Sequence, residues 1–465
     1  MYRKGHIHFV GIGGIGMSGI AKILRYQGYK ISGCDQDTDQ KSVEDLTKIG
    51  CQVFNGNNSP LCQSSDVDVL VYSSAIKPDN PEIKWAQEKG IPTIPRALML
   101  AELMRTKYSI AITGAHGKTT TTSMISHILI ESHKDPTVII GGHLHSISAN
   151  ARLGMGDFLV AEADESDRSL LRLYPTLAVV TNIDLEHLET YKDLDDIKQT
   201  FKEFLANIPF YGKAILCIDD LHIQSILPLE HIKTIKYGLD SKLADYFATD
   251  IELFPEHSTF ILHHKNEILG KIKLNIPGKH NILNSLAAIA VCLDLDVEFK
   301  KISQALANFK GVDRRFTFKG TYKGAELFDD YGHHPTEIEN IIPVAKRRAK
   351  NKLIVIFQPQ RFIRTIKLWH NFIETFYKCE IDHLIITDIH PGPGEAKIEN
   401  VTSEQLVEEL KKRNPKFVVQ YVEFDKNFEK IKEKLEPLIE KENLILTLGA
   451  GKLNKFADIM FKNEQ

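Results

Sequence analysis

The sequence has few cysteines and no strong excess of either charge. Its six cysteines are scattered and none forms a Cys-x-x-Cys pair, so their spacing indicates neither a zinc site nor a redox motif. This usage is typical of a reducing compartment, and we expect a cytoplasmic protein. The formal net charge is only -3, which gives no global basic field to attract nucleic acid or a membrane surface.

Long hydrophobic runs are also missing. No stretch reaches the roughly 18 apolar residues that a membrane-spanning helix needs. A composition with 43% hydrophobic and 26% charged residues is typical of a globular protein. The length of 465 residues favours about three domains, at roughly 150 residues for each domain.

The most informative stretch begins with an apolar strand over Ile110–Ile112. The glycines Gly114 and Gly117 follow this strand, and a helical pattern starts at Lys118. A strand, a glycine loop, a Lys-Thr pair and a helix predict a phosphate-binding loop, because backbone N–H groups and the helix dipole face the anion. Lys118 can reach the β- and γ-phosphates of a nucleotide, and the Thr119 hydroxyl can ligate Mg²⁺.

The spacing in this loop is shorter than the general pattern. Two residues, rather than four, separate Gly114 from the Gly117-Lys118 pair. The other interpretation is an ordinary glycine turn ahead of a helix. Each glycine costs roughly 0.5–1 kcal/mol relative to alanine where the backbone has no need of it, so the pattern favours anion binding.

A second glycine-rich loop lies near the N-terminus. Residues 11–19 read GIGGIGMSG between a predicted strand and a predicted helix, and the next strand ends at Asp35, 24 residues after Gly11. This is Gly-x-Gly-x-x-Gly in a β-α-β unit, which predicts close approach of the backbone to a pyrophosphate and an acid for a ribose hydroxyl. The pattern indicates a nucleotide diphosphate without specifying which one.

Polar clusters follow two further apolar strands. Residues 158–161 run into EADESD from Glu162, about forty residues after the phosphate loop, where a nucleotide-bound Mg²⁺ finds its carboxylate. The alternative is an acidic surface loop. Residues 177–180 lead into TNIDLEH, and spacing alone leaves His187 equally open as a ligand or as a structural histidine.

The remainder of the chain alternates between strands and helices. Strands are predicted over residues 325–328, 353–357, 384–389, 417–422 and 444–448. This alternation predicts another doubly wound unit, with polar clusters at its strand ends. We therefore expect an α/β protein with a Rossmann-like N-terminal domain over residues 1–105, a central P-loop α/β domain over 106–313 and a Rossmann-like C-terminal domain over 314–465.

Two anion sites on separate domains restrict the chemistry. A hydride-transfer enzyme needs only the first loop, and a simple phosphotransferase needs only the second. Together they favour an enzyme that uses ATP and a second, diphosphate-bearing substrate. One fitting chemistry is carboxylate activation, in which a carboxylate attacks the γ-phosphate and an amine then displaces phosphate from the acyl phosphate. Lys118 and Arg315 would hold the phosphoryl oxygens.

At this point the motifs resemble those of the Mur ligases of bacterial peptidoglycan synthesis. The segments that carry the resemblance are GIGGIGMSG (11–19), SSAI (73–76), GAHGKTTTT (114–122), EADESD (162–167), TNIDLEHLETY (181–191), GKHNILN (278–284), GVDRRF (311–316), DDYGHHPTE (329–337) and FQPQRFIRT (357–365). They cover nearly the whole chain in order. The resemblance implies an ATP- and Mg²⁺-dependent ligase that joins L-alanine to the lactyl carboxylate of UDP-N-acetylmuramate through an acyl phosphate.

The resemblance also implies roles for individual residues. Those implied to bind ATP are Gly114, Ala115, His116, Gly117, Lys118, Thr119, Thr120, Asn281, Arg315 and Asp330. Those implied to bind the UDP-sugar are Gly11, Gly13, Gly14, Gly16, Met17, Ser18, Asp35, Ser73, Ser74, Arg96, His143, Asn150 and Arg152. The amino acid would contact Tyr331, His333 and Arg361, and the metal would contact Thr119, Glu162 and His187. The implied catalytic residues are Lys118, His187, Arg315 and His333.

Several alternatives remain open on sequence grounds. A peptidoglycan-recycling ligase would join a tripeptide to the same nucleotide sugar, although the GIGGIGMSG loop favours the alanine ligase. An NAD-dependent oxidoreductase could be built on the first glycine loop, and a non-catalytic nucleotide-binding regulator could use both loops. The expected partners are small-molecule substrates, without nucleic acid or membrane, and the resemblance allows a homodimer.

Overall fold

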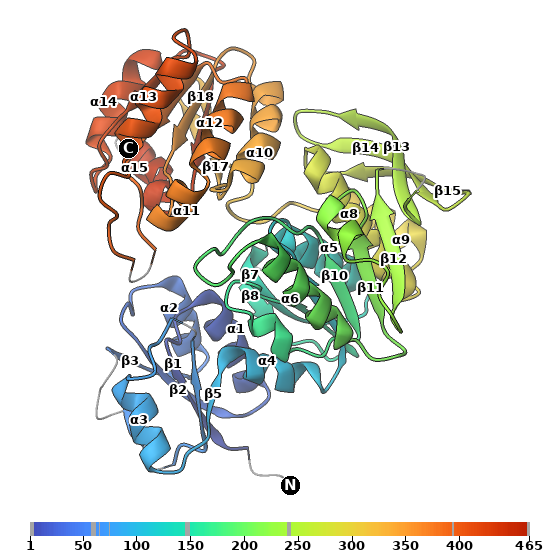
Figure 1. The fold of residues 1–465 in the computed structure, drawn as a ribbon. Coiled ribbons are helices and arrows are strands. Elements are labelled where there is room, and N and C mark those ends of the chain that lie inside the picture. Colours follow the sequence, from blue (N-terminus) through green and yellow to red (C-terminus); the bar gives the residue numbers. More distant parts are fainter. Residues whose placement is uncertain are drawn as a thin grey trace.

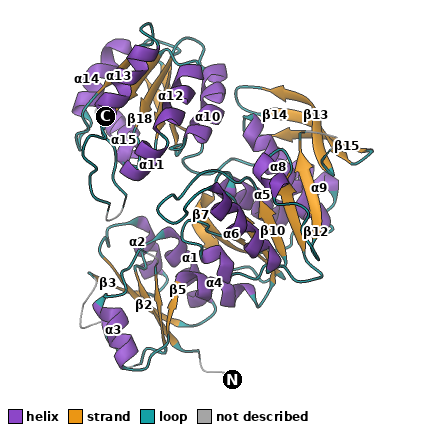
Figure 2. Ribbon diagram, in the orientation of Figure 1, coloured by secondary structure: helices purple, strands orange, loops and turns teal. Residues whose placement is uncertain are grey.

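We describe the chain from a computed structural model that covers residues 4–56, 62–64, 66–73, 75–144, 149–239, 243–392 and 395–462. Three sheets, each flanked by helices, follow one another along the chain (Figures 1 and 2). This architecture confirms the predicted α/β fold with three successive units. Among the described helices, none combines the length and the apolar composition that crossing a bilayer requires.

The N-terminal unit is a parallel five-stranded sheet in the order β3-β2-β1-β4-β5. Its strands are β1 (His6–Val10), β2 (Lys30–Asp35), β3 (Gln52–Asn55), β4 (Val69–Tyr72) and β5 (Thr93–Pro95). Its helices are α1 (Ile15–Tyr26), α2 (Lys41–Lys48), α3 (Pro81–Glu88) and α4 (Arg96–Met104). Because strand side chains alternate between faces, Phe9 of β1 joins the core under α1, whereas Val10 joins a smaller core with Ile83 of α3.

The central unit is a ten-stranded sheet in the order β15-β14-β13-β12-β11-β10-β6-β9-β7-β8. Its strands are β6 (Tyr108–Thr113), β7 (Thr137–Leu144), β8 (Ala149–Arg152), β9 (Phe158–Glu162), β10 (Leu177–Val180), β11 (Lys213–Cys217), β12 (Lys233–Gly238), β13 (Tyr246–Leu253), β14 (Ser258–His264) and β15 (Glu267–Leu274). Its helices are α5 (Lys118–Glu131), the 3₁₀ helix η2 (Ser169–Arg172), α6 (Leu194–Ala206), α7 (Leu221–Ser225), α8 (Lys279–Asp294) and α9 (Phe299–Asn308). The antiparallel extension β13-β14-β15 was not foreseen from the sequence.

The C-terminal unit is a six-stranded sheet in the order β16-β17-β21-β18-β19-β20, parallel except at the β16 edge. Its strands are β16 (Thr317–Tyr322), β17 (Ala325–Asp330), β18 (Leu353–Phe357), β19 (His383–Ile386), β20 (Val419–Tyr421) and β21 (Leu444–Leu448). Its helices are α10 (Pro335–Arg348), α11 (Phe362–Lys367), α12 (Trp369–Lys378), α13 (Ser403–Arg413), α14 (Glu429–Leu435), η3 (Glu436–Leu438), η4 (Lys452–Lys455) and α15 (Phe456–Lys462). Separate apolar cores lie on the two faces of this sheet.

Two strands of this sheet are shorter than the predicted ones. β19 ends at Ile386 rather than at residue 389, and β20 covers only Val419–Tyr421. The Asp388 carboxylate explains the early ends, because it accepts hydrogen bonds from the Tyr421 hydroxyl at 2.8 Å and from the Phe424 backbone N–H at 2.8 Å. These bonds replace the sheet ladder beyond both strands.

Candidate active site between the central and C-terminal domains

A cavity of about 740 Å³ lies where the central and C-terminal units meet. Its walls include the phosphate loop, the start of α8, the end of β17 and the first turns of α10. Predicted ATP-binding residues in the wall are His116, Gly117, Thr120, Asn281, Arg315 and Asp330. This volume is typical of a small-molecule site, and the cavity draws on parts of the chain more than 200 residues apart.

The backbone of the phosphate loop requires glycine at two positions. Gly114 has φ +130°, and a Cβ atom there would lie 2.1 Å from the Thr181 hydroxyl. Gly117 has φ +82°, and a Cβ atom would lie 2.5 Å from Asn284 Oδ1. Any side chain would therefore be both strained and blocked. The glycines let the loop fold tightly between β6 and the N-terminus of α5.

Lys118, the first residue of α5, folds back over the loop. Its Nζ donates a hydrogen bond to the Ala115 carbonyl at 3.2 Å and forms an ion pair of 2.7 Å with Glu165 Oε1. Burial disfavours the charged amine, but Glu165 outweighs it and raises the pKa of Lys118. Lys118 is therefore a fixed cation at the end of the phosphate loop.

His116 connects this loop to the C-terminal unit. Its Nε2 lies 2.9 Å from Asp184 Oδ2, its Nδ1 lies 3.6 Å from Glu337 Oε1, and its ring lies 4.8 Å from the ring of His334. Burial opposes the charge, but the two carboxylates raise the pKa of His116 to about 10. The described residues thus hold an imidazolium at the domain junction.

The three predicted metal ligands make separate contacts near the phosphate loop. Thr119 bonds to Glu162, whose pKa is raised by burial and lowered in part by Thr119 and Lys118. His187 Nε2 lies 3.3 Å from Glu165 Oε1, the oxygen that also pairs with Lys118. Burial lowers the pKa of His187, but Glu165 and Glu189 raise it to about 9.

This group is suited to a hard divalent cation. It offers carboxylate, hydroxyl and imidazole donors, which Mg²⁺ accepts, together with the buried Glu165 Oε2. No hydrogen-bond partner for Glu165 Oε2 is found among the described residues. An unpartnered carboxylate oxygen on the residue that contacts both Lys118 and His187 is where a cation would be favourable.

The C-terminal unit presents its own charges to the cavity. Arg315 Nη1 lies 3.4 Å from Glu337 Oε1, and the guanidinium stands 5.3 Å from the centre of the Tyr331 ring. A capping box at the start of α10 orients Glu337, because its Oε2 accepts the backbone N–H of the N-cap residue His334 at 3.3 Å. The same oxygen accepts the His333 backbone N–H at 3.0 Å. Burial raises the pKa of Asp330 to about 6, although Arg315 opposes that rise.

His333 is held as a neutral imidazole. Burial and the positive charge of Arg364 lower its pKa to about 4. Its Nδ1 lies 3.0 Å from the Tyr331 carbonyl oxygen, so Nδ1 carries the proton and Nε2 is left as an acceptor. The ring of Tyr331 meets the His333 ring edge-on at 5.1 Å.

Ion pairs fix the C-terminal unit against the central one. Arg364 donates through Nε and Nη2 to the two carboxylate oxygens of Glu186 at 2.9 and 3.1 Å, and both side chains are buried. Arg361 pairs with Glu189, beside His187. Thr336 Oγ1 donates to Asp184 Oδ2 at 2.7 Å. These contacts hold the predicted amino-acid residues next to the predicted metal ligands.

Asn281, which is predicted to bind ATP, lies in the first turn of the largely buried helix α8. Asn281 Nδ2 donates to the Pro277 carbonyl at 2.7 Å, and its Oδ1 accepts from Asn284. The neighbouring His280 has a pKa lowered to about 4 by burial and by Arg315. Asn281 lines the cavity, but in this arrangement its amide is engaged with the helix start.

The N-terminal glycine loop lies between β1 and α1. Asp35 Oδ2 accepts the Gly13 backbone N–H at 2.8 Å, and Ser73 lies against Gly11. Gly14 and Gly16 flank the start of α1, where unpaired backbone N–H groups favour an anion. The side chains of Met17 and Ser18 are buried, so only their backbone could contact a ligand.

The remaining predicted UDP-sugar residues are divided between two places. Asn150 Nδ2 donates to the Ile15 carbonyl at 2.6 Å and to Ser18 Oγ at 3.1 Å, which joins β8 to the glycine loop. Arg96 pairs with Asp164 of the central unit at 3.0 Å, with its Nη1 beside Gly16. Arg152 pairs instead with Asp135. Ser74 and the side chain of His143 lie outside the described residues.

Sequence reasoning missed several residues of the junction. Glu165, Asp184, Glu337 and Arg364 were not predicted as site residues. The first three pair with the predicted residues Lys118, His116 and Arg315, and Arg364 pairs with Glu186. Glu165 stood within the acidic cluster after β9, so a signal was present. Glu337 and Arg364 lie in the segments DDYGHHPTE and FQPQRFIRT, so a signal was present for them as well. The tertiary structure brings Glu337 to the cavity and Arg364 to Glu186.

These features define a class of protein. A phosphate loop with a fixed lysine, a carboxylate and imidazole cluster and a second glycine loop, spread over three α/β domains, are typical of nucleotide-dependent enzymes that bring two further reactants together. Comparisons with known proteins narrow the class.

Three family models match consecutive parts of the chain. They are "Mur ligase family, catalytic domain" over residues 6–108, "Mur ligase middle domain" over 112–292 and "Mur ligase, glutamate ligase domain" over 314–451. The chain belongs to the Mur ligase family. This placement excludes the NAD-dependent oxidoreductase as the class of the protein.

Relatives are similar over nearly the full length. The UDP-N-acetylmuramate–L-alanine ligase of Geobacter sp. (strain M21) is 48% identical over 462 residues, covering 99% of this chain and 98% of that protein. The enzyme of the same name from Geotalea uraniireducens (strain Rf4) is 48% identical over 454 residues, covering 97% of each. The crystal structure of the UDP-N-acetylmuramate-alanine ligase from Thermotoga maritima matches with a TM-score of 0.80 at 27% identity, covering 99% of both chains.

Proposed function

We propose that this chain is an ATP-dependent ligase that joins L-alanine to the lactyl carboxylate of UDP-N-acetylmuramate. The products are UDP-N-acetylmuramoyl-L-alanine, ADP and phosphate, and the reaction belongs to peptidoglycan precursor synthesis. The full-length similarity to ligases of this name supports the substrates. The cations at the junction of the central and C-terminal units support the chemistry.

One observation carries the chemical part of the proposal. Arg315 of the C-terminal unit lines the same cavity as His116 and Gly117 of the phosphate loop, and Lys118 of the central unit ends that loop and pairs with Glu165. Two cations from facing domains can hold a γ-phosphate while a substrate carboxylate oxygen attacks it. The attack breaks the γ-phosphate bond to ADP and gives an acyl phosphate. The alanine amine then displaces inorganic phosphate.

The amine needs a group that accepts its proton. We assign this role to His333, because its ring is neutral and the contact of Nδ1 with the Tyr331 carbonyl leaves Nε2 as the acceptor. Tyr331 lies beside His333, and Arg361 lies beside Glu189. Arg361 would pair with the alanine carboxylate. The N-terminal glycine loop would hold the UDP diphosphate.

The donor types of Thr119, Glu162 and His187 fit Mg²⁺, and Glu165, whose Oε2 is unpartnered among the described residues, contacts His187. When bound, the ion would offset the negative charge that otherwise repels the carboxylate from ATP. Lys118, Arg315 and the loop N–H groups would orient the phosphates. We also propose domain boundaries near residues 105 and 313 and a cytoplasmic location. We further propose a homodimer, and analytical ultracentrifugation would test this oligomeric state.

Phosphate release from ATP tests the proposal. The assay contains UDP-N-acetylmuramate and Mg²⁺, with and without L-alanine, and mass spectrometry identifies the product. We expect release only when both substrates are present. Release with neither substrate would contradict the proposal, because the enzyme would then be a plain ATPase.

The peptidoglycan-recycling alternative is distinguished in the same assay. Release that requires the tripeptide and ignores alanine would keep the acyl-phosphate chemistry and change the amine acceptor. Glycine and serine are tested as further amine acceptors. The residues predicted to contact the amino acid would bind its charged groups, and they define its side chain less clearly.

A further inference from the structure

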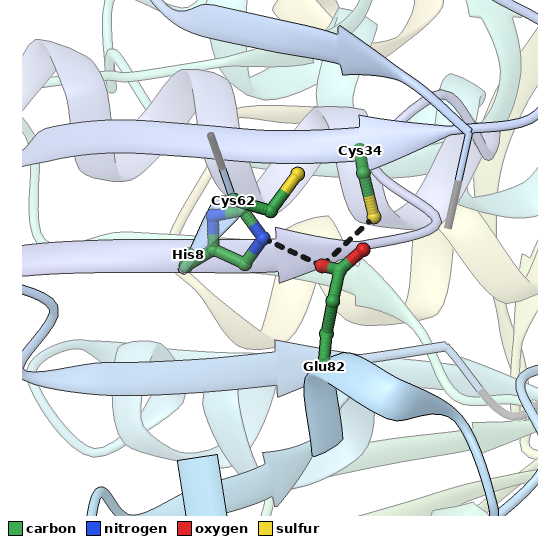
Figure 3. Close-up of side chains that lie close together, drawn as sticks. All are labelled: His8, Cys34, Cys62 and Glu82. Atoms are coloured by element: carbon green, nitrogen blue, oxygen red, sulfur yellow. Dashed lines mark hydrogen bonds and ion pairs between the residues drawn. The ribbon is translucent and has the colours of Figure 1, made fainter. Parts of the chain in front are cut away.

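Four buried side chains converge in the N-terminal unit, away from the proposed active site. They are His8 of β1, Cys34 of β2, Cys62 of the segment between β3 and β4, and Glu82 of α3 (Figure 3). The possible ligand atoms of all four lie within 4.8 Å of one another. None of these residues is needed by the reaction proposed above.

The geometry of the group is set by regular structure. His8 Nε2 lies 2.9 Å from Glu82 Oε2, and Cys34 Sγ lies 3.1 Å from the same oxygen. Asn80 caps α3 and accepts the Glu82 backbone N–H at 2.9 Å, so Glu82 lies in the first turn of the helix, with its carboxylate turned toward the sheet. Parallel pairing places β1 beside β2 and directs His8 and Cys34 to the same face.

The group is almost completely closed to solvent. Each of the four residues is at most 1% exposed, in an apolar core that also contains Val10, Leu70 and Ile83. Glu82 Oε1 has no hydrogen-bond partner among the described residues. A carboxylate in an apolar core with one unpartnered oxygen is unfavourable unless a cation neutralises it.

Hydrogen bonds behind His8 fix its ring. Its Nδ1 lies 2.8 Å from Ser32 Oγ, which in turn lies 2.7 Å from His6 Nε2. His6 Nδ1 lies 3.0 Å from Asp66. Metal-binding histidines almost always use their second nitrogen in this way, because the bond orients the ring and leaves the other nitrogen for the metal.

We propose that His8, Cys34, Cys62 and Glu82 bind one Zn²⁺ ion. Two thiolates and an imidazole select a borderline-soft metal such as zinc over Mg²⁺, which prefers oxygen donors alone. Four protein ligands in a dry core leave no open coordination position, so the site is structural rather than catalytic. The sequence spacing did not predict this zinc site, because each ligand comes from a different element and no Cys-x-x-Cys pair is present.

The zinc ion would connect α3 and the segment at Cys62 to the centre of the sheet. Cys34 is also the residue whose backbone carbonyl accepts the Gly11 and Ile12 N–H groups, at 2.9 and 3.0 Å. The metal therefore supports the strand end from which the glycine loop begins. Its loss should lower the stability of the N-terminal unit before it affects the ATP site.

Metal content tests the proposal directly. The untagged full-length protein is produced in zinc-supplemented medium, purified without chelator and analysed by elemental mass spectrometry. We expect about one zinc per chain in the wild type and in the control Cys51→Ser, which changes a buried cysteine of the same unit outside the cluster. Cys34→Ser should lose most of the zinc.

A second measurement does not depend on the folding of a variant. X-ray absorption of the wild-type zinc should show two sulfur neighbours at about 2.3 Å. Cobalt added to demetallated wild type should give a thiolate charge-transfer band, which a metal at the phosphate loop cannot produce. Zinc-free wild type without that band, or a Cys34–Cys62 disulfide in freshly purified protein, would overturn the proposal.

Discussion

The two glycine loops of this chain begin in the same way and end in very different surroundings. Each follows a parallel strand, β1 or β6, and each leads into a helix, α1 or α5. At the phosphate loop, Lys118, His116 and Glu165 form a dense network of charges that reaches into the C-terminal unit. At the N-terminal loop, Asp35 accepts Gly13 and holds the loop itself.

This difference indicates that the N-terminal loop serves substrate binding and that the phosphate loop serves the chemical step. A backbone loop at a helix N-terminus suffices to hold a diphosphate, and the N-terminal loop has little beyond this. Transfer of a phosphoryl group also needs cations that neutralise the developing charge and a partner domain that positions the second reactant. Only the phosphate loop has both. Changes at the phosphate loop should therefore reduce turnover, whereas changes at the N-terminal loop should weaken substrate binding.

The largest effect is expected from Lys118→Met. Removal of a phosphate-contacting cation should lower kcat by roughly 10³-fold or more, with UDP-N-acetylmuramate binding unchanged. Lys202→Met, at an exposed position of α6, is the matched control. Turnover and calorimetric binding of the nucleotide sugar make the comparison. A variant that loses binding and keeps kcat would reverse the roles assigned to the two loops.

Arg364→Met tests the contact between the phosphate-loop side and the C-terminal unit. It leaves Glu186 buried without its partner, which should cost about 3–5 kcal/mol in the free energy of unfolding. Arg413→Met breaks the half-exposed pair with Glu374 and should cost less than about 1 kcal/mol. Denaturant titration measures both. Equal costs would show that the buried pair contributes no more than a surface pair.

Asp35→Ala examines the N-terminal loop. The variant loses the charged acceptor for the Gly13 N–H, which should reduce the free energy that stabilises the ordered loop by about 1.5–3 kcal/mol. This corresponds to a rise of roughly 10- to 100-fold in the KM for the nucleotide sugar. The KM for ATP and kcat should change little, and the exposed Asp39→Ala is the control. A fall in kcat with an unchanged KM would contradict the division between the loops.

The smallest effect concerns pH. The pKa of His116 is raised to about 10 by Asp184 and Glu337 against the effect of burial, and the ring of His334 lies 4.8 Å away. The folded protein then binds more protons than the unfolded chain above pH 6.5, so the stability from this residue is lost as pH rises toward 10. The loss should not exceed about 1.4 kcal/mol per pH unit.

Thermal unfolding of the nucleotide-free protein from pH 7 to pH 9 tests this expectation. His116→Gln should flatten the fall in Tm, although His187, with a pKa of about 9, retains part of the slope. A wild-type Tm that rises over this range, or an unchanged slope in the variant, would show that His116 is not held as a cation.

The local parts of this account could be read from the sequence. Both glycine loops, the acids after β9 and most strands of the parallel sheets depend on neighbours within a few residues, so spacing predicted them. The antiparallel strands β13 to β15 were missed because their alternating pattern lies on a partly exposed extension. Their pairing depends on partners that no short motif identifies.

Contacts between domains could not be read in this way. Glu186 and Arg364 are far apart in the chain, and each resembles a surface charge until the domains pack together. The same holds for His8, Cys34, Cys62 and Glu82, whose spacing matches no metal motif. When the role of a residue depends on neighbours from several elements, the sequence shows its type but does not show which residues it contacts.

The central claim is that the phosphate loop and the C-terminal unit transfer the γ-phosphate of ATP to a substrate carboxylate. The most direct measurement uses UDP-N-acetylmuramate with oxygen-18 in its lactyl carboxylate, together with ATP and L-alanine. The account predicts that the released phosphate carries one labelled oxygen, because the attacking carboxylate oxygen leaves with the phosphate. Unlabelled phosphate accompanying amide product would contradict it, since the carboxylate would not have been phosphorylated.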